Sequence, residues 1–143
     1  MKKLYRLLLN KKYKLKSYID SFSNKNISGW VYEEGIKFSE IRLLIGNNVV
    51  ANSKIEIFRE DVNRSLKIND NLLLGFSLDF NFKNEFKKYK GEPRLIVFNN
   101  DSSSSHDLFK NKKYNSIKNK LKNFFQGNIN GLPKSFDLIL EED

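Results

Sequence analysis

Apolar and polar residues alternate along the middle of the chain with a period of two. The clearest run is GFSLDFNFK (75–83), in which Phe76, Leu78, Phe80 and Phe82 share one face. Such alternation is typical of an antiparallel strand with one buried face. Similar runs predict further strands in SYIDSFS (17–23), NISGWVYEEG (26–35), SEIRLLIGNNVVANSKIEIF (39–58) and EPRLIVFNND (92–101).

The alternation also predicts which side chains share a face, because successive residues of a strand point to opposite sides. In 17–23 it assigns Ile19 and Ser21 to one face, and to the other face Tyr18, Asp20 and Phe22. In 39–58 it assigns one face to Ile41, Leu43 and Ile45. The Gly46-Asn47-Asn48 segment predicts a tight hairpin turn, since Gly and Asn tolerate positive φ.

Several short strands separated by turns predict a mainly β fold, a two-layer antiparallel β-sandwich over residues 17–109, either Ig-like or jelly-roll-like. A short helix is predicted on each side. Residues 1–16 form a basic amphipathic helical arm with Leu4, Leu7 and Leu8 at helical spacing. Residues 110–143 contain a basic helix that ends near Gly127, followed by a tail. The apolar stripe of this helix is predicted to pack against the sandwich or a partner: Ile117, Leu121, Phe124 and Phe125.

Charge is distributed unevenly in this chain of 143 residues with a net charge of +9. Residues 1–16 contain seven Lys or Arg and no acid, and residues 110–122 contain six Lys and no acid. Residues 17–109 contain 12 basic and 13 acidic residues, so the predicted sandwich is close to neutral. A nucleic-acid-binding sandwich would carry positive charge on its folded face. Any contact with an anionic membrane or nucleic acid is therefore predicted for the two flanks.

Composition limits the chemistry further. The chain has no Cys and one His, His106, which excludes thiolate sites and makes a His-based metal cluster or triad improbable. Ser105, His106 and Asp107 are neighbours in a polar stretch that we interpret as a loop, whereas a triad needs convergence in space. We predict no enzyme activity, no cofactor and no metal site. The N-terminus has no signal-peptide cleavage site, and no apolar run approaches the ~20 residues of a membrane span. We expect a cytoplasmic protein that can associate peripherally with the inner membrane.

Trp30 and Tyr32 are the candidate ligand-binding residues. A lone Trp in a β-domain is usually core or half-core, because it buries a large area, and this is the expectation here. The alternative is that Trp30 forms a stacking platform for a sugar ring. Tyr32 lies two residues further on the same face and would extend that platform.

The FREDV segment that follows the predicted hairpin is expected to have a structural role. Arg59 can form a bidentate pair with a carboxylate, and Asp61 can accept from loop amides or cap a short helical turn at 61–66. Glu60 and Asp61 make a poor acid–base pair with each other, because adjacent residues on an extended chain point apart.

Read in order, YIDSFSNKNISGWVYEEG, IRLLIGNNVVANSKIEIFREDV and LLLGFSLDF resemble a small β-sandwich domain of bacterial proteins. That domain is often attached to glycosyltransferases and other enzymes of surface-polysaccharide biosynthesis. The resemblance covers roughly residues 17–100, and its matching positions are Gly29, Trp30, Arg59, Asp61, Gly75 and Phe76. It implies a non-catalytic accessory module with sugar-binding capacity, and as partners a glycan or a glycosyltransferase. The alternative is a tethering protein whose basic flanks contact an anionic membrane or nucleic acid.

Overall fold

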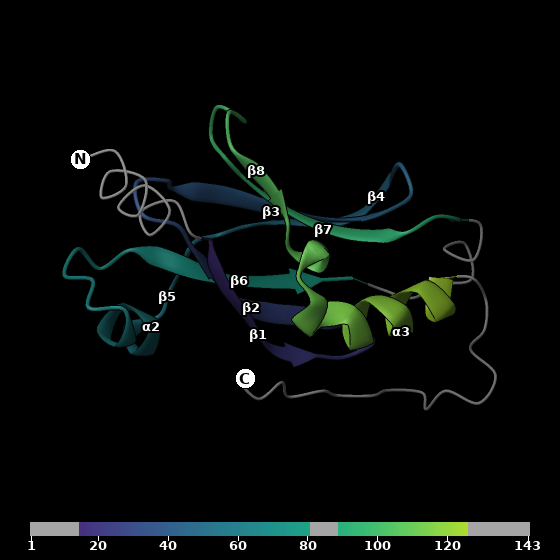
Figure 1. Cartoon of the computed structure of the whole chain (residues 1–143), viewed down its shortest axis with the longest axis horizontal. Helices are drawn as coiled ribbons and strands as arrows, with labels where there is room; N and C mark the ends of the chain where they lie inside the picture. Colours follow the sequence, from purple (N-terminus) through teal and green to yellow (C-terminus); the bar gives the residue numbers. More distant parts are fainter. Residues whose placement is uncertain (1–14, 81–88, 126–143) are drawn as a thin grey trace, which may run out of the picture.

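The computed structural model describes residues 15–80 and 89–125 and forms a β-sandwich of two antiparallel sheets (Figure 1). The predicted fold class is confirmed. The first sheet has the order β1 (Lys16–Phe22), β2 (Asn26–Tyr32), β6 (Leu73–Asp79), β5 (Ile57–Phe58). The second has the order β4 (Asn48–Lys54), β3 (Phe38–Ile45), β7 (Pro93–Asn99), β8 (Ser105–Asp107). The helical elements are α2 (Glu60–Ser65), η2 (Leu108–Lys110), η3 (Lys112–Tyr114) and α3 (Asn115–Phe125).

The strand order is that of an immunoglobulin-type sandwich. If β1 to β8 are lettered A, B, C, C′, D, E, F and G, the two sheets have the strand orders A-B-E-D and C′-C-F-G. The connections β2–β3, β5–β6 and β7–β8 lie at one end of the sandwich. At this end β2 ends at Tyr32 and β7 ends at Asn99, while β3 begins at Phe38 and β6 begins at Leu73. We call this the α2 end, since the β5–β6 connection contains α2.

Alternating inward residues of both sheets form the core. On β3 the inward residues Ile41, Leu43 and Ile45 are buried, as the alternation predicted. On β6 the residues Leu74, Phe76 and Leu78 point inward, and Phe80 follows them into the core. Phe82 lies outside the described residues. The predicted turn at Gly46 joins β3 to β4, with Gly46 at φ +60°.

The predicted alternation of β1 is wrong at one point. Ile19 and Phe22, assigned to opposite faces, are both fully buried. The register between β1 and β2 shifts between Ile19 and Ser21, so Asp20 is the extra residue of a β-bulge. A Cβ on Gly29, opposite the bulge, would lie 2.1 Å from the carbonyl oxygen of Tyr18. The close approach of the two strands therefore requires glycine at position 29.

The C-terminal helix packs onto the sandwich as predicted. Ile117, Leu121 and Phe125 of α3 are fully buried in the same core as the sheets, while Phe124 is half-buried. Tyr114, just before α3, is also fully buried, and its hydroxyl lies 2.8 Å from Oγ of Ser17 on β1. In Figure 1, α3 lies beside the sheets on the side of β1 and β7. The core therefore includes residues beyond 109.

The buried hydroxyl of Tyr114 makes stability depend on pH in the alkaline range. Burial raises its pKa from 10.0 to about 12. Between these values the unfolded chain releases the Tyr114 proton while the folded chain keeps it, so the free energy of unfolding falls as the pH rises. We expect Tyr114 to contribute a loss of roughly 2–3 kcal/mol between pH 10 and pH 12. Urea unfolding of the parent chain and of Tyr114→Phe across this range measures it, and two parallel pH profiles would contradict it.

The predictions for the two chain ends fall largely outside the described residues. Only Leu15 and Lys16 of the predicted arm, and 110–125 of the C-terminal region, are described, so the arm helix, Gly127 and the tail stay predictions. Within 15–80 and 89–125, no helix has the length and apolar character needed to cross a membrane.

Candidate functional site

The outer face of the first sheet carries the two predicted aromatic residues. On β2, Ile27 and Val31 are buried and face the core, so Trp30 and Tyr32 face outward. Both outward side chains are half-buried. Of the two expected positions, core or half-core, Trp30 has the second: it is half-buried on the outer face, because the core face of β2 falls on the odd-numbered residues. The two residues do share a face, as predicted.

Trp30 lies in the middle of a row that crosses the first sheet. Its cross-strand neighbours are Tyr18 on β1 and Gly75 on β6, and Gly75 is in turn opposite Ile57 on β5. Directly opposite residues share a face of the sheet. Gly75 has no side chain, so the space above it on the outer face, beside Trp30, is open to a neighbouring side chain. Arg59 occupies this space.

Arg59 directly follows β5, and its side chain crosses the outer face of the first sheet. A Cβ on Gly75 would lie 2.9 Å from Cγ of Arg59, so the arginine stem passes over this glycine. Nη1 donates to Oδ2 of Asp20 at 2.5 Å. Nε and Nη2 donate to the two carboxylate oxygens of Asp61 at 3.0 and 2.9 Å. The bidentate pair predicted for Arg59 is present, and Asp20 of the bulge adds a second carboxylate from the far edge of the sheet.

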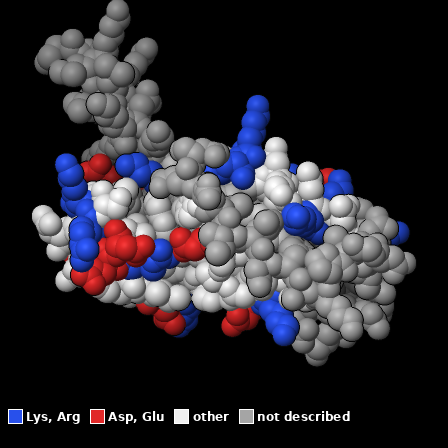
Figure 2. All heavy atoms as spheres, turned by 90° about the horizontal axis from the view of Figure 1, so that it is seen from below, with Lys and Arg blue, Asp and Glu red and all other residues white. Residues whose placement is uncertain are grey.

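In the FREDV segment, the hydrogen bonds of Arg59 shift the pKa values of Arg59 and Asp61 in directions that favour their charged forms. The hydrogen bonds from Arg59 hold the pKa of Asp61 below its usual range, and those same bonds, with the bonds to Asp20, raise the pKa of Arg59. Glu60 pairs instead with Arg64, at 2.5 Å. Acidic and basic side chains gather at the end that holds α2 and β5 (Figure 2). The segment is a salt-bridged corner, and Asp61 does not cap α2, whose N-cap Arg59 has no side-chain cap bond.

A polar row runs beside the aromatic row on the same outer face. Nδ2 of Asn26 donates to Oγ of Ser77 at 2.8 Å and to Oδ1 of Asp79 at 2.6 Å. Ser28, between Asn26 and Trp30, donates its hydroxyl hydrogen to Oδ1 of Asn26. The outer face thus combines an aromatic part with an ordered set of hydroxyl, amide and carboxylate groups.

Asn63 is a structural residue that the sequence interpretation missed. Its side chain is buried in α2 and spans the β5–β6 connection. Nδ2 donates to the carbonyl oxygens of Arg59 at 2.9 Å and Leu72 at 3.0 Å, and Oδ1 accepts from the Leu72 amide at 2.9 Å. Asn63 therefore positions both Arg59 and the start of β6. Only its place after the predicted corner hinted at this role.

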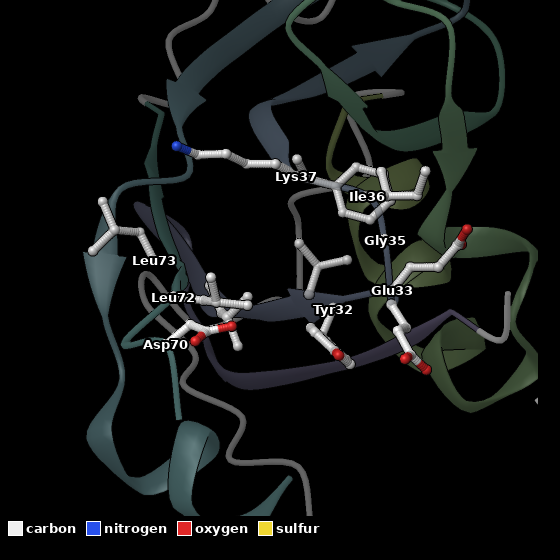
Figure 3. Close-up of a pocket in the computed structure, with 12 residues that line it drawn as sticks. Tyr32, Glu33, Gly35, Ile36, Lys37, Asp70, Leu72 and Leu73 are labelled. Atoms are coloured by element: carbon white, nitrogen blue, oxygen red, sulfur yellow. The ribbon is translucent and has the colours of Figure 1, made fainter. Parts of the chain in front are cut away.

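A pocket of about 380 Å³ opens at the α2 end of the sandwich, between the β2–β3 and β5–β6 connections. Figure 3 shows Leu72 and Leu73 on one side and Ile36 on the other, with Lys37, Asp70 and Tyr32 at the edges. Partial burial, with Glu34 and Asp70 nearby, raises the pKa of Tyr32. Tyr32 therefore belongs both to the outer aromatic face and to the rim of this pocket.

His106 lies in a strand, which corrects the predicted loop. It is the middle residue of β8, opposite Val97, and its Nε2 lies 3.1 Å from Oε1 of the buried Glu33. The Asp107 carboxylate accepts from the amides of Leu95 and Phe109 instead of approaching His106. Ser105, His106 and Asp107 do not converge. The described part of the chain holds no group of three or more His, Asp or Glu side chains placed to bind a metal ion.

Comparisons with family models, with curated proteins and with solved structures found no match to this chain.

Proposed function

We propose that this chain is a non-catalytic binding module that recognises a glycan on the outer face of its first sheet. The observation that carries the proposal is the outward, half-buried position of Trp30 in a row with Tyr18. A sugar ring presents an apolar C–H face that suits an aromatic surface, and its hydroxyls need donors and acceptors at the edge. The neighbouring polar row, with Asn26 and Ser28, offers both.

In this role Arg59 and Asp61 support the platform. The stem of Arg59 lies over Gly75, beside Trp30 in the same row, and its charge is taken up by Asp20 and Asp61. A neutralised, fixed guanidinium suits an uncharged ligand better than an anionic one. The biological setting we propose is surface-polysaccharide biosynthesis, in which the module would present a glycan to a glycosyltransferase partner.

Trp30→Ala is expected to weaken glycan binding while leaving the protein folded. Loss of the platform should weaken affinity at least about tenfold, which corresponds to ~1.4 kcal/mol. Because Trp30 is only half-buried, we expect Tm to fall by no more than about 5 °C. A glycan array identifies a ligand, and calorimetric titration measures its affinity for the parent and the variant.

A matched control exists on the opposite sheet. Phe98 is a half-buried aromatic residue on the outer face of β7, with the Arg42 guanidinium 4.6 Å from its ring centroid. Phe98→Ala should leave glycan affinity unchanged. If both variants bind like the parent, or if Trp30→Ala unfolds the chain, the platform is refuted.

The tethering alternative draws less support from the C-terminal flank. Lys118 and Lys122, two of its six lysines, contact Glu92 at 3.5 and 2.5 Å. The hydrogen bond from Lys122 lowers the pKa of Glu92. Lys113 donates to the carbonyl oxygen of Ser17 at 2.5 Å. Lys118 and Lys122 of α3 and Lys113 of η3 contact residues of the sandwich or of the segment before β7, and are less available for an anionic surface.

A further inference from the structure

The α2-end pocket belongs to a larger apolar surface. Its inner wall is formed by the core residues Val31, Phe38 and Leu74. Leu73 lines this pocket and also an adjoining hollow that it shares with Phe58. Leu73 and Phe58 are 42% and 45% exposed, unusually high for large apolar side chains. Contiguous exposed apolar surface of this kind marks an interaction site.

The rim of the pocket carries uncompensated negative charge. Glu34 and Asp70 form no ion pair with any residue in 15–80 or 89–125. Lys37 is the one basic residue lining the pocket within those same ranges. A partner for this surface should therefore present apolar side chains together with basic ones.

We propose that the occupant is the chain's own N-terminal segment, residues 1–14, with Leu4, Leu7 and Leu8 in the pocket and its basic residues near Glu34 and Asp70. The segment holds six Lys or Arg and no acid. Three apolar residues at i, i+3 and i+4 are the anchors by which an amphipathic helix enters an apolar groove. This inference does not rest on the proposed glycan role.

The segment enters the sandwich beside the pocket. Lys16, the first residue of β1, pairs with Tyr32, which lines the pocket rim. Paired strands lie about 4.8 Å apart. The seven residue-to-residue steps from Leu8 to Leu15 span roughly 10 Å as a helix and at most about 25 Å when extended. The leucine stripe can therefore reach the pocket of the same molecule.

Charge and position both disfavour the C-terminal segment as occupant. Residues 126–143 carry four acids and one Lys, the wrong sign for this rim. They follow α3, whose last turn is held at Glu92 by Lys122. Glu92 precedes β7, and Pro93 at the start of β7 pairs with Ile45 at the end of the sandwich opposite the pocket.

A spin label placed on the segment tests the proposal in the full chain. The chain contains no Cys, so Tyr5→Cys accepts a single nitroxide. We expect the amide signals of residues 33–38 and 70–74 to lose most of their intensity, and those of residues 46–48 at the opposite end to keep theirs. Replacing Leu4, Leu7 and Leu8 together with Ser should restore the lost signals, and Glu34→Gln with Asp70→Asn should restore them in part.

Three results would overturn the docking in cis. The first is equal broadening at both ends of the sandwich, or broadening that the triple Ser variant leaves unchanged. The second is broadening of the same amides in isotope-labelled chains that carry no spin label when they are mixed with spin-labelled chains, which would make the occupant a second copy. The third is that the amide signals of residues 33–38 and 70–74 keep their intensity while the spin-labelled segment binds vesicles of anionic lipid. The segment would then be a membrane tether.

Discussion

Gly29→Ala is expected to lower the free energy of unfolding by about 3 kcal/mol or more, at the upper end of what overpacking causes. The added methyl group would lie 2.1 Å from the carbonyl oxygen of Tyr18 and 3.0 Å from Cα of Ile19. Both obstacles are backbone atoms of β1, so no side-chain rotation relieves the clash. The strand pair must separate at the bulge, next to Ile19, which is fully buried.

Gly35→Ala is the matched control for this substitution. Gly35 has φ +84°, and a Cβ there would meet no atom within 4 Å. Its alanine variant therefore carries only the left-handed backbone strain, about 1 kcal/mol. Urea unfolding monitored by Trp30 fluorescence compares the two variants with the parent. Equal losses for Gly29→Ala and Gly35→Ala would show that β1 and β2 do not approach as closely as described.

Local patterns predicted the parts of the fold that depend on local chemistry. The alternation of β3 and β6 and the glycine turn at Gly46 follow from neighbouring residues, and all were confirmed. The stripe on α3 followed from helical spacing and was confirmed at its three core positions. Each of these elements is amphipathic, so the residue pattern alone indicates which side is buried.

The candidate site depended on contacts that no local pattern contains. Alternation assigns Trp30 and Val31 to opposite faces of β2 but does not say which face meets the second sheet. The bulge at Asp20 turns Phe22 into the core, and the carboxylate of Asp20 pairs with Arg59, which lies 39 residues away in sequence. His106 was assigned to a loop because its neighbours are polar, although pairing with β7 makes it part of a strand.

The salt-bridged corner and the α2-end pocket share one support. Asn63 holds the carbonyl of Arg59 on one side and both backbone polar groups of Leu72 on the other. Leu72 lines the pocket, and Arg59 crosses the aromatic face. A change at Asn63 should therefore disturb both surfaces. It would do so indirectly, because the hydrogen bonds of its buried side chain go to the backbone of Arg59 and Leu72.

Asn63→Ala is expected to lower the free energy of unfolding by roughly 3 kcal/mol, because it removes three hydrogen bonds and leaves the partly buried amide and carbonyl of Leu72 without their partner. The amide of Leu72 should also lose its protection from hydrogen exchange, since its acceptor is Oδ1 of Asn63. Asn63→Asp retains this acceptor and loses both donations from Nδ2. Its Leu72 amide should stay protected although the chain is destabilised. Urea unfolding and amide exchange measure the two effects.

Asn123→Ala provides the control for Asn63→Ala. Asn123 is exposed on α3, where alanine is the better helix former, so this variant should be neutral or slightly stabilising. Unfolding curves for Asn63→Ala and Asn123→Ala that both overlay the parent would remove Asn63 as the support of the corner. Loss of stability at Asn63 with unchanged exchange at Leu72 would place its contribution in the two bonds that Nδ2 donates, to the carbonyl oxygens of Arg59 and Leu72.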